Sequence, residues 1–148
     1  MFKWTYSESV TTEATPEQIW AMWQDVSSWP CWDSELKWVK LNGDFIEGAT
    51  GKMKPASGPE VDFTLSRVEL NRAFSNMAKL PLTSLVFDHE YFASSGKGDP
   101  ARICHSVTMT GLLAPVFGRL IGNKIKSHLR DAIMELSQRA LNDNKSIR

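Results

Sequence analysis

The chain has 148 residues, 42% of them hydrophobic and 23% charged, which is long enough to bury a core without disulfides or metal ions. Its 17 basic and 17 acidic residues cancel, so the net charge gives no reason to expect nucleic acid or an anionic membrane as a partner. No apolar run is long enough for a secretory signal or a membrane span, and we expect one cytoplasmic domain over residues 1–148, a monomer or homodimer.

The first residues predict a strand followed by a capped helix. Aromatic residues alternate along Phe2–Ala14, as they do in a strand with two different faces. Thr15 can cap a helix, Pro16 suits its first turn, and Gln18 can complete a capping box. Apolar side chains then recur at helical spacing: Ile19, Trp20, Trp23 and Val26. Together these residues predict a helix that begins after Thr15.

Six extended segments follow a short helical turn. Pro30 is expected to stop the helix and to leave one short turn around Asp25–Trp29. The segments are Glu35–Leu41, Ala49–Pro55, Glu60–Leu70, Ala73–Leu80, Leu82–Ser94 and Ala101–Leu112. Glycine, proline or asparagine punctuates most of the gaps, and no repeat or linker suggests a second domain.

The last two extended segments predict an antiparallel hairpin that places two histidines opposite each other. They flank a turn at residues 95–100, and symmetry about Lys97 pairs His89 with His105. Because side chains alternate between faces, the histidines share one face with Leu85, Phe87, Tyr91, Ile103, Val107 and Met109. The other face is polar and includes Asp88 and Glu90. Two imidazoles on an apolar face indicate a small-molecule cavity.

The chain closes with a predicted helix from about Pro115 to Asn142. Its apolar stripe consists of Phe117, Ile121, Ile125, Leu129, Ile133, Leu136 and Ala140. Such a helix is about 40 Å long and must lie across a sheet. Gly118 and Gly122, one turn apart, predict either the close approach of another backbone or empty volume.

This order of elements resembles the START-related SRPBCC superfamily, in its polyketide cyclase/dehydrase-like branch. The landmarks are residues 15–20, 29–33, 41–45, 48–51, 89–90, 105–107 and 111–117. The resemblance implies the helix-grip fold, an α+β fold in which a curved antiparallel sheet of six or seven strands wraps around a long C-terminal helix. It also implies two short helices after the first strand and a mostly apolar cavity. It does not settle the chemistry, because this superfamily includes cyclases, lipid carriers and hormone receptors.

The histidine pair has three interpretations. The imidazoles can be satisfied core residues that hydrogen-bond each other or a nearby hydroxyl, or they can line the cavity and bind or protonate a ligand oxygen. As metal ligands they would supply only two groups, so we expect no metal and no cofactor. His128 is expected at the rim. Cys31 and Cys104 have no metal or redox spacing and are expected to be reduced, although one disulfide stays possible.

The predicted cavity wall combines both sides of the grip. Its residues are Trp20, Trp23, Met53, Phe63, Phe87, His89, Tyr91, Ile103, His105, Val107, Met109, Phe117, Ile121, Ile125 and Leu129. A cluster of four tryptophans is typical of a packed domain end, and some of its members could instead form an aromatic portal for a flat ligand: Trp20, Trp23, Trp29 and Trp32. The direction of Trp38 cannot be read, since both faces of its strand are mixed.

Two function classes follow from these observations. The first is binding or transport of a hydrophobic small molecule such as a lipid, an aromatic or a polyketide-like compound. The second is a cyclase/dehydrase-type enzyme with His89 or His105 as acid–base. Binding is favoured, because the chain carries no activated nucleophile or phosphate loop. A third class, a module that binds another protein, requires an exposed apolar patch.

Overall fold

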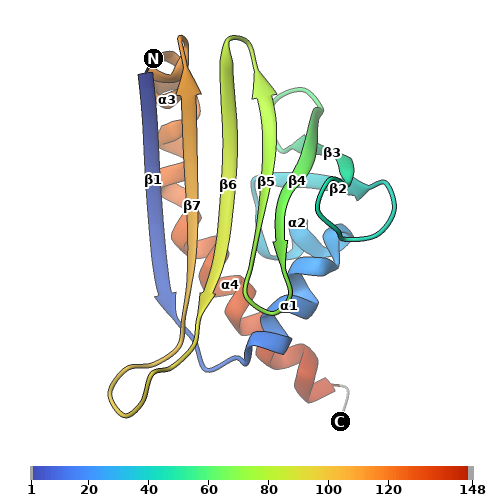
Figure 1. The fold of residues 1–148 in the computed structure, drawn as a ribbon, viewed down its shortest axis with the longest axis vertical. Helices are drawn as coiled ribbons and strands as arrows, with labels where there is room; N and C mark the ends of the chain where they lie inside the picture. Colours follow the sequence, from blue (N-terminus) through green and yellow to red (C-terminus); the bar gives the residue numbers. More distant parts are fainter. Residues whose placement is uncertain (1, 147–148) are drawn as a thin grey trace.

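The computed structural model describes residues 2–146 and consists of a curved sheet with helices on its concave side (Figure 1). The strands are β1 (Phe2–Thr11), β2 (Leu36–Leu41), β3 (Thr50–Pro55), β4 (Val61–Glu69), β5 (Ala73–Leu80), β6 (Thr83–Phe92) and β7 (Arg102–Gly111). They form a seven-stranded antiparallel sheet in the order β1-β7-β6-β5-β4-β3-β2. The predicted α+β helix-grip architecture is confirmed.

The helices after β1 begin as the sequence predicts. They are α1 (Pro16–Gln24), the 3-10 turn η1 (Val26–Ser28) and α2 (Trp29–Trp32). The Gln18 backbone N–H donates to the Thr15 hydroxyl over 3.1 Å, and the Thr15 N–H donates to the Gln18 side chain over 2.8 Å, which closes the capping box. Pro30 does not stop a helix as expected. It lies in the first turn of α2, where a proline leaves no intrahelical bond unmade.

The C-terminal helix is not continuous, which corrects the prediction of one helix over residues 115–142. The chain forms α3 (Ala114–Leu120) and α4 (Gly122–Ser146), and Ile121 between them has φ −115° and ψ −21°, which departs from ideal helical values within the right-handed region. Trp4 of β1 packs into this bend, because an added Cβ on Gly118 or on Gly122 would lie 2.7 Å from its ring. The glycines therefore admit a tryptophan side chain rather than a backbone. Among residues 2–146, no helix is long and apolar enough to cross a membrane.

The β6–β7 register pairs His89 with His105, as the hairpin symmetry predicts. The other expected pairs also form: Leu85 with Met109, Phe87 with Val107, and Tyr91 with Ile103. Asp88 and Glu90 lie on the outer face, where they contact Ser75 and Arg67.

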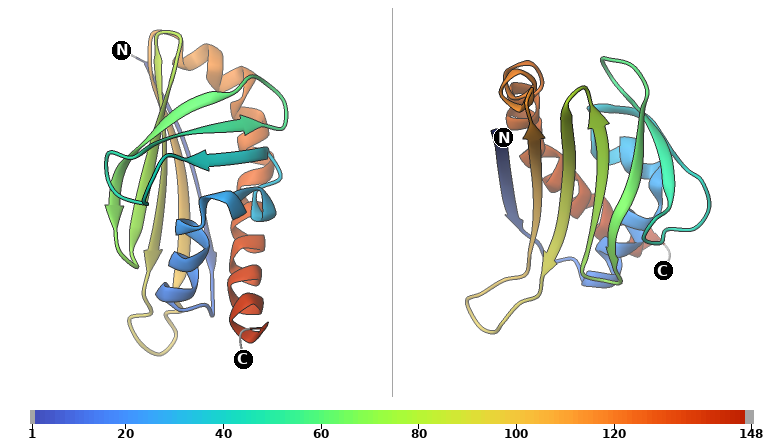
Figure 2. Two further views of the ribbon diagram at one scale, coloured as in Figure 1. Left: turned by 90° about the vertical axis from the view of Figure 1, so that its right-hand side faces the viewer. Right: turned by 45° about the horizontal axis from the view of Figure 1, so that its top comes forward.

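The helices α1, α2 and α4 cover the concave face unevenly. The long helix α4 crosses the sheet diagonally and packs mainly against β1, β7, α1 and α2 (Figure 2). At the end of the concave face that α1 and α2 cover, side chains from α1, α2, α4 and the sheet pack together. The other end faces only α3 and the first turns of α4 (Figure 2).

Candidate functional site

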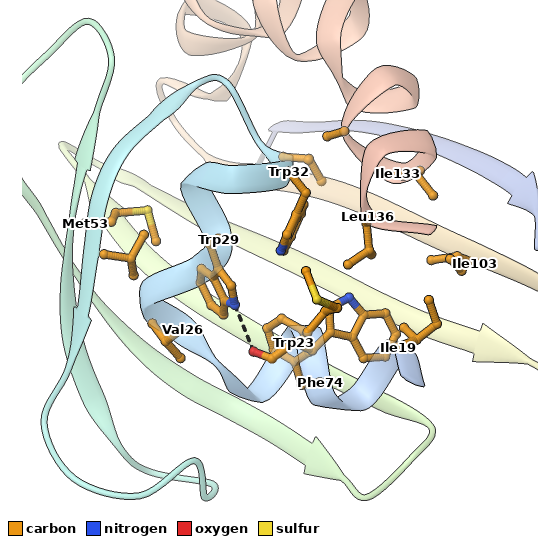
Figure 3. Close-up of a cluster of buried hydrophobic side chains, with 14 of the residues drawn as sticks. Ile19, Trp23, Val26, Trp29, Trp32, Met53, Phe74, Ile103, Ile133 and Leu136 are labelled. Atoms are coloured by element: carbon orange, nitrogen blue, oxygen red, sulfur yellow. Dashed lines mark hydrogen bonds between the residues drawn. The ribbon is translucent and has the colours of Figure 1, made fainter. Parts of the chain in front are cut away.

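Three tryptophans from α1 and α2 fill the volume beside the histidine pair. Trp23, Trp29 and Trp32 are at most 5% exposed, and they pack against Phe74 and against residues of α4 (Figure 3). The Trp29 indole N–H donates to the Trp23 carbonyl oxygen over 2.8 Å, which ties α2 to α1 (Figure 3). This end of the grip is an aromatic core.

The two imidazoles lie inside this core and contact each other edge to face. Their ring centroids are 4.5 Å apart, and the His89 ring stacks on Phe74 at 4.0 Å. Trp23 lies 6.1 Å from each imidazole, and Trp32 lies 5.8 Å from His105. Surface pockets of about 680 and 330 Å³ lie at the β2–β3 connection and beside the β4–β5 turn, and neither histidine lines them. Indole rings therefore occupy the space predicted to be open beside them.

Burial keeps both imidazoles neutral. It lowers the pKa of His89 to about 4, against a smaller opposing effect of the hydrogen bond from Nδ1 to the Phe74 carbonyl oxygen, 3.2 Å away. That bond assigns the proton to Nδ1, so Nε2 of His89 is an acceptor. Burial, and then the neighbouring His89, lower the pKa of His105 well below its ordinary value. At neutral pH the pair carries no charge.

The buried polar atoms around the histidine pair do not all have hydrogen-bond partners. Nε2 of His105 is buried and has no hydrogen-bond partner, and neither do the indole nitrogens of Trp23 and Trp32. Each unpaired buried group costs about 1–3 kcal/mol. The two imidazoles therefore do not satisfy each other: His89 is bonded to the Phe74 carbonyl oxygen, and Nε2 of His105 has no partner.

The other half of the concave face is apolar and only partly covered. Phe87 lies on β6, an interior strand of the sheet, and points inward, yet it keeps some exposure, whereas Val107 beside it is fully buried. The facing residues on α3, the bend and α4 are also only partly buried: Phe117, Ile121, Ile125 and Leu129. An inward side chain at the middle of a sheet is normally covered by the opposing layer. Here the first turns of α4 leave apolar surface partly exposed, both on the sheet at Phe87 and on the helices themselves.

Asn76 is a polar residue in this region that the sequence did not reveal. It pairs with Phe87 across β5 and β6, is 2% exposed, and its Oδ1 has no hydrogen-bond partner. Thr83, the first residue of β6, is also inward and buried and has an unpaired hydroxyl. The available signal was an asparagine between Phe74 and Ala78 on the apolar face of β5, where a buried amide is rare without a partner.

The remaining residues of the predicted cavity wall divide between the aromatic core under α1 and α2 and the partly covered face beside α3. Trp20 contacts Trp23 and Phe45, and the Tyr91 hydroxyl donates to the Ala14 carbonyl oxygen over 2.7 Å. The other buried members are Met53, Phe63, Ile103, Val107 and Met109. The structure therefore does not bring all the predicted residues around one space.

Four further residues from the sequence analysis lie outside both the aromatic core and the partly covered apolar face. His128 on α4 is half-exposed, and its Nε2 lies 3.0 Å from the Glu35 carboxylate. Trp38 points to the outer face, next to Lys40. Cys31 and Cys104 are free thiols, and no group of three metal-ligating side chains occurs among the described residues.

Solved structures share this fold at low sequence identity. The chain matches Ara h 8.0201 with a TM-score of 0.68 and 14% identity, over 95% of this chain and 99% of that one. It matches norcoclaurine synthase from Thalictrum flavum with a TM-score of 0.69 and 13% identity, over 95% and 94% of the two chains. The di-domain ARO/CYC protein StfQ of the steffimycin biosynthetic pathway matches with a TM-score of 0.74 and 7% identity. That match spans 97% of this chain and 52% of StfQ.

Comparison at the level of sequence finds no match. No family model and no curated protein matches this chain. The structural neighbours have the helix-grip fold of the superfamily that the sequence resembles, and at these identities they establish the fold alone.

Proposed function

We propose that the protein binds a hydrophobic small molecule between the central strands and the bend that joins α3 to α4. The observation that carries the proposal is the partial exposure of Phe87 and of the helix residues Phe117, Ile121 and Ile125, all of which pack against the core. Apolar surface left uncovered inside a fold is stabilised by an apolar ligand, at about 25 cal/mol per Å² removed from water. A lipid, an aromatic or a polyketide-like compound has the required character.

The chemistry of the histidines favours binding over catalysis. A general base works best when its pKa lies near the operating pH, and burial brings the pKa of His89 to about 4. The rings of Phe74, Trp23 and Trp29 also surround His89, which limits the approach of a substrate atom. The cyclase/dehydrase-type alternative therefore has weaker support, although two of the structural neighbours are named as a synthase and as an ARO/CYC protein.

Replacing Phe87 by serine should weaken the binding of the neutral probe N-phenyl-1-naphthylamine about tenfold or more, because the variant removes an aromatic face worth about 1.5–3 kcal/mol of apolar burial. The matched control is Val86→Ser, because Val86 is the adjacent residue and points to the outer face. Fluorescence titration of both variants and of the original protein measures the affinities. Equal losses in the two variants, or no loss in Phe87→Ser while its melting curve stays cooperative, would refute the proposed location.

Replacing Asn76 by leucine should raise the free energy of unfolding by about 1 kcal/mol, because it removes a buried amide with an unpaired oxygen. The same variant should lose any preference for 2-naphthol over naphthalene, since the amide would no longer pair with the hydroxyl. Urea unfolding and competition with the naphthylamine probe measure the two effects. A stability loss with the preference retained would make Asn76 a structural residue and not a ligand contact.

A further inference from the structure

Five large apolar side chains are exposed together at one end of the molecule. They are Phe2, Leu82, Leu112, Val116 and Leu120, between 48% and 66% exposed, and we call them the apolar end. Phe2 and Thr83 both pair with Gly111, and Leu82 and Leu112 are the next residues along the chain. The start of β1, the β5–β6 turn and α3 lie at the same end in both views (Figures 1 and 2).

The backbone holds these residues in place. Leu82 has φ +51°, an uncommon conformation for leucine that the tight β5–β6 turn imposes. Gly111 lies against this turn, and a Cβ on it would be 2.2 Å from the Leu82 carbonyl oxygen. The turn therefore presents a leucine to solvent on a well-defined backbone.

Basic residues surround the apolar end, and acidic residues are absent from the segments that form it. Lys3 and Lys79 lie on one cross-strand row of the outer face, with the neutral Thr110 and Ser84 between them. Arg119 is exposed on α3. Segments 2–7, 70–87 and 100–130 contain no aspartate or glutamate. Among the described residues, none of these three cations forms an ion pair with a carboxylate.

We infer that the apolar end docks on the surface of an anionic lipid bilayer. Clustered exposed apolar side chains mark an interaction site. Because lysine and arginine but no acidic residue accompany the cluster, the matching partner has an apolar interior beneath a negatively charged surface. An anionic lipid bilayer has this arrangement. The zero net charge of the whole chain conceals this local excess, because the acidic residues lie in other segments.

The bilayer fits these observations better than a second copy of the chain does. In a two-fold dimer through this end, Lys3, Lys79 and Arg119 would face their own copies without acidic partners. An anionic membrane supplies the missing negative charge, and long basic side chains can reach headgroups while the leucines enter the interface.

The test is co-sedimentation with vesicles and needs no ligand, so it is independent of the proposed binding function. We expect the protein to bind vesicles of phosphatidylcholine mixed with phosphatidylglycerol, and to bind pure phosphatidylcholine at least tenfold more weakly. Leu82→Asn should reduce binding about tenfold, since asparagine tolerates the left-handed backbone of this turn. Lys3→Gln and Lys79→Gln should each reduce it about fivefold.

The matched control is Leu70→Asn. Leu70 is 73% exposed in the β4–β5 turn at the opposite end of the sheet (Figure 1), and its replacement should leave vesicle binding unchanged. Equal losses for Leu70→Asn and Leu82→Asn, or equal binding to charged and uncharged vesicles, would overturn the inference. Sedimentation equilibrium completes the test. A dimer that Leu82→Asn dissociates, with no vesicle binding in either protein, would assign the apolar end to a second copy instead.

Discussion

Replacing Trp23 by alanine should lower the free energy of unfolding by about 3–5 kcal/mol, the largest effect expected of the substitutions considered. Trp23 is fully buried and contacts Trp20, Phe74 and both imidazoles, with ring centroids 5.4–6.2 Å apart. Its removal leaves a cavity where α1, the sheet and α4 meet. Urea unfolding at neutral pH, followed by circular dichroism, measures the loss.

The control for this substitution is Trp38→Ala. Trp38 lies on the outer face of β2 next to Lys40, so its truncation opens no cavity and should cost about 1 kcal/mol or less. A comparable loss in the two variants would contradict the description of this end of the grip as a packed core. A small loss in Trp23→Ala would do the same, because it would show that the ring borders open space.

Lowering the pH from 7 to 5 should reduce the free energy of unfolding by about 2 kcal/mol through the buried imidazoles. The pKa of His89 is about 4 in the folded protein and about 6.5 when the chain is unfolded, so the unfolded state binds more protons between these values. The stabilisation is complete above about pH 6.5 and is lost as the pH falls toward 4. The lowered pKa of His105 acts in the same direction. Unfolding curves at a series of pH values measure the slope.

The double variant His89→Phe/His105→Phe should show a much flatter pH profile, whereas His128→Gln should keep the original slope because both buried imidazoles remain. Comparison between variants is needed, since burial raises the pKa of Asp33, which shifts stability the opposite way as the pH falls. An unchanged slope in the double variant would contradict the assignment of the pH dependence to these imidazoles.

The same histidine variants separate a structural role from a ligand-binding role. His105→Phe removes a buried unpaired nitrogen, whereas His89→Phe removes the donor to the Phe74 carbonyl oxygen. His89→Phe should therefore cost about 1 kcal/mol more than His105→Phe at neutral pH. If either imidazole touches a ligand, its replacement also weakens the binding of the naphthylamine probe. A stability change with the probe affinity unaltered would restrict the pair to the core.

The local features of this protein could be predicted from the sequence because they depend on neighbours in the chain. The capping box at Thr15 needs only residues three apart, and both of its hydrogen bonds form. The pairing of His89 with His105 follows from hairpin symmetry, since strand alternation then assigns every side chain of β6 and β7 to a face. The order of the elements was enough to predict the helix-grip fold.

Only the tertiary structure decided how the interior is filled and what the ends of the molecule present. The volumes of Trp23, Trp29 and Trp32 close the space beside the histidines, and no pattern along the chain reports how much space the sheet leaves. The side chain that packs against Gly118 and Gly122 belongs to Trp4, more than a hundred residues away in the sequence. The apolar end likewise gathers side chains from three distant segments, because charge and apolar surface become local properties only after the chain has folded.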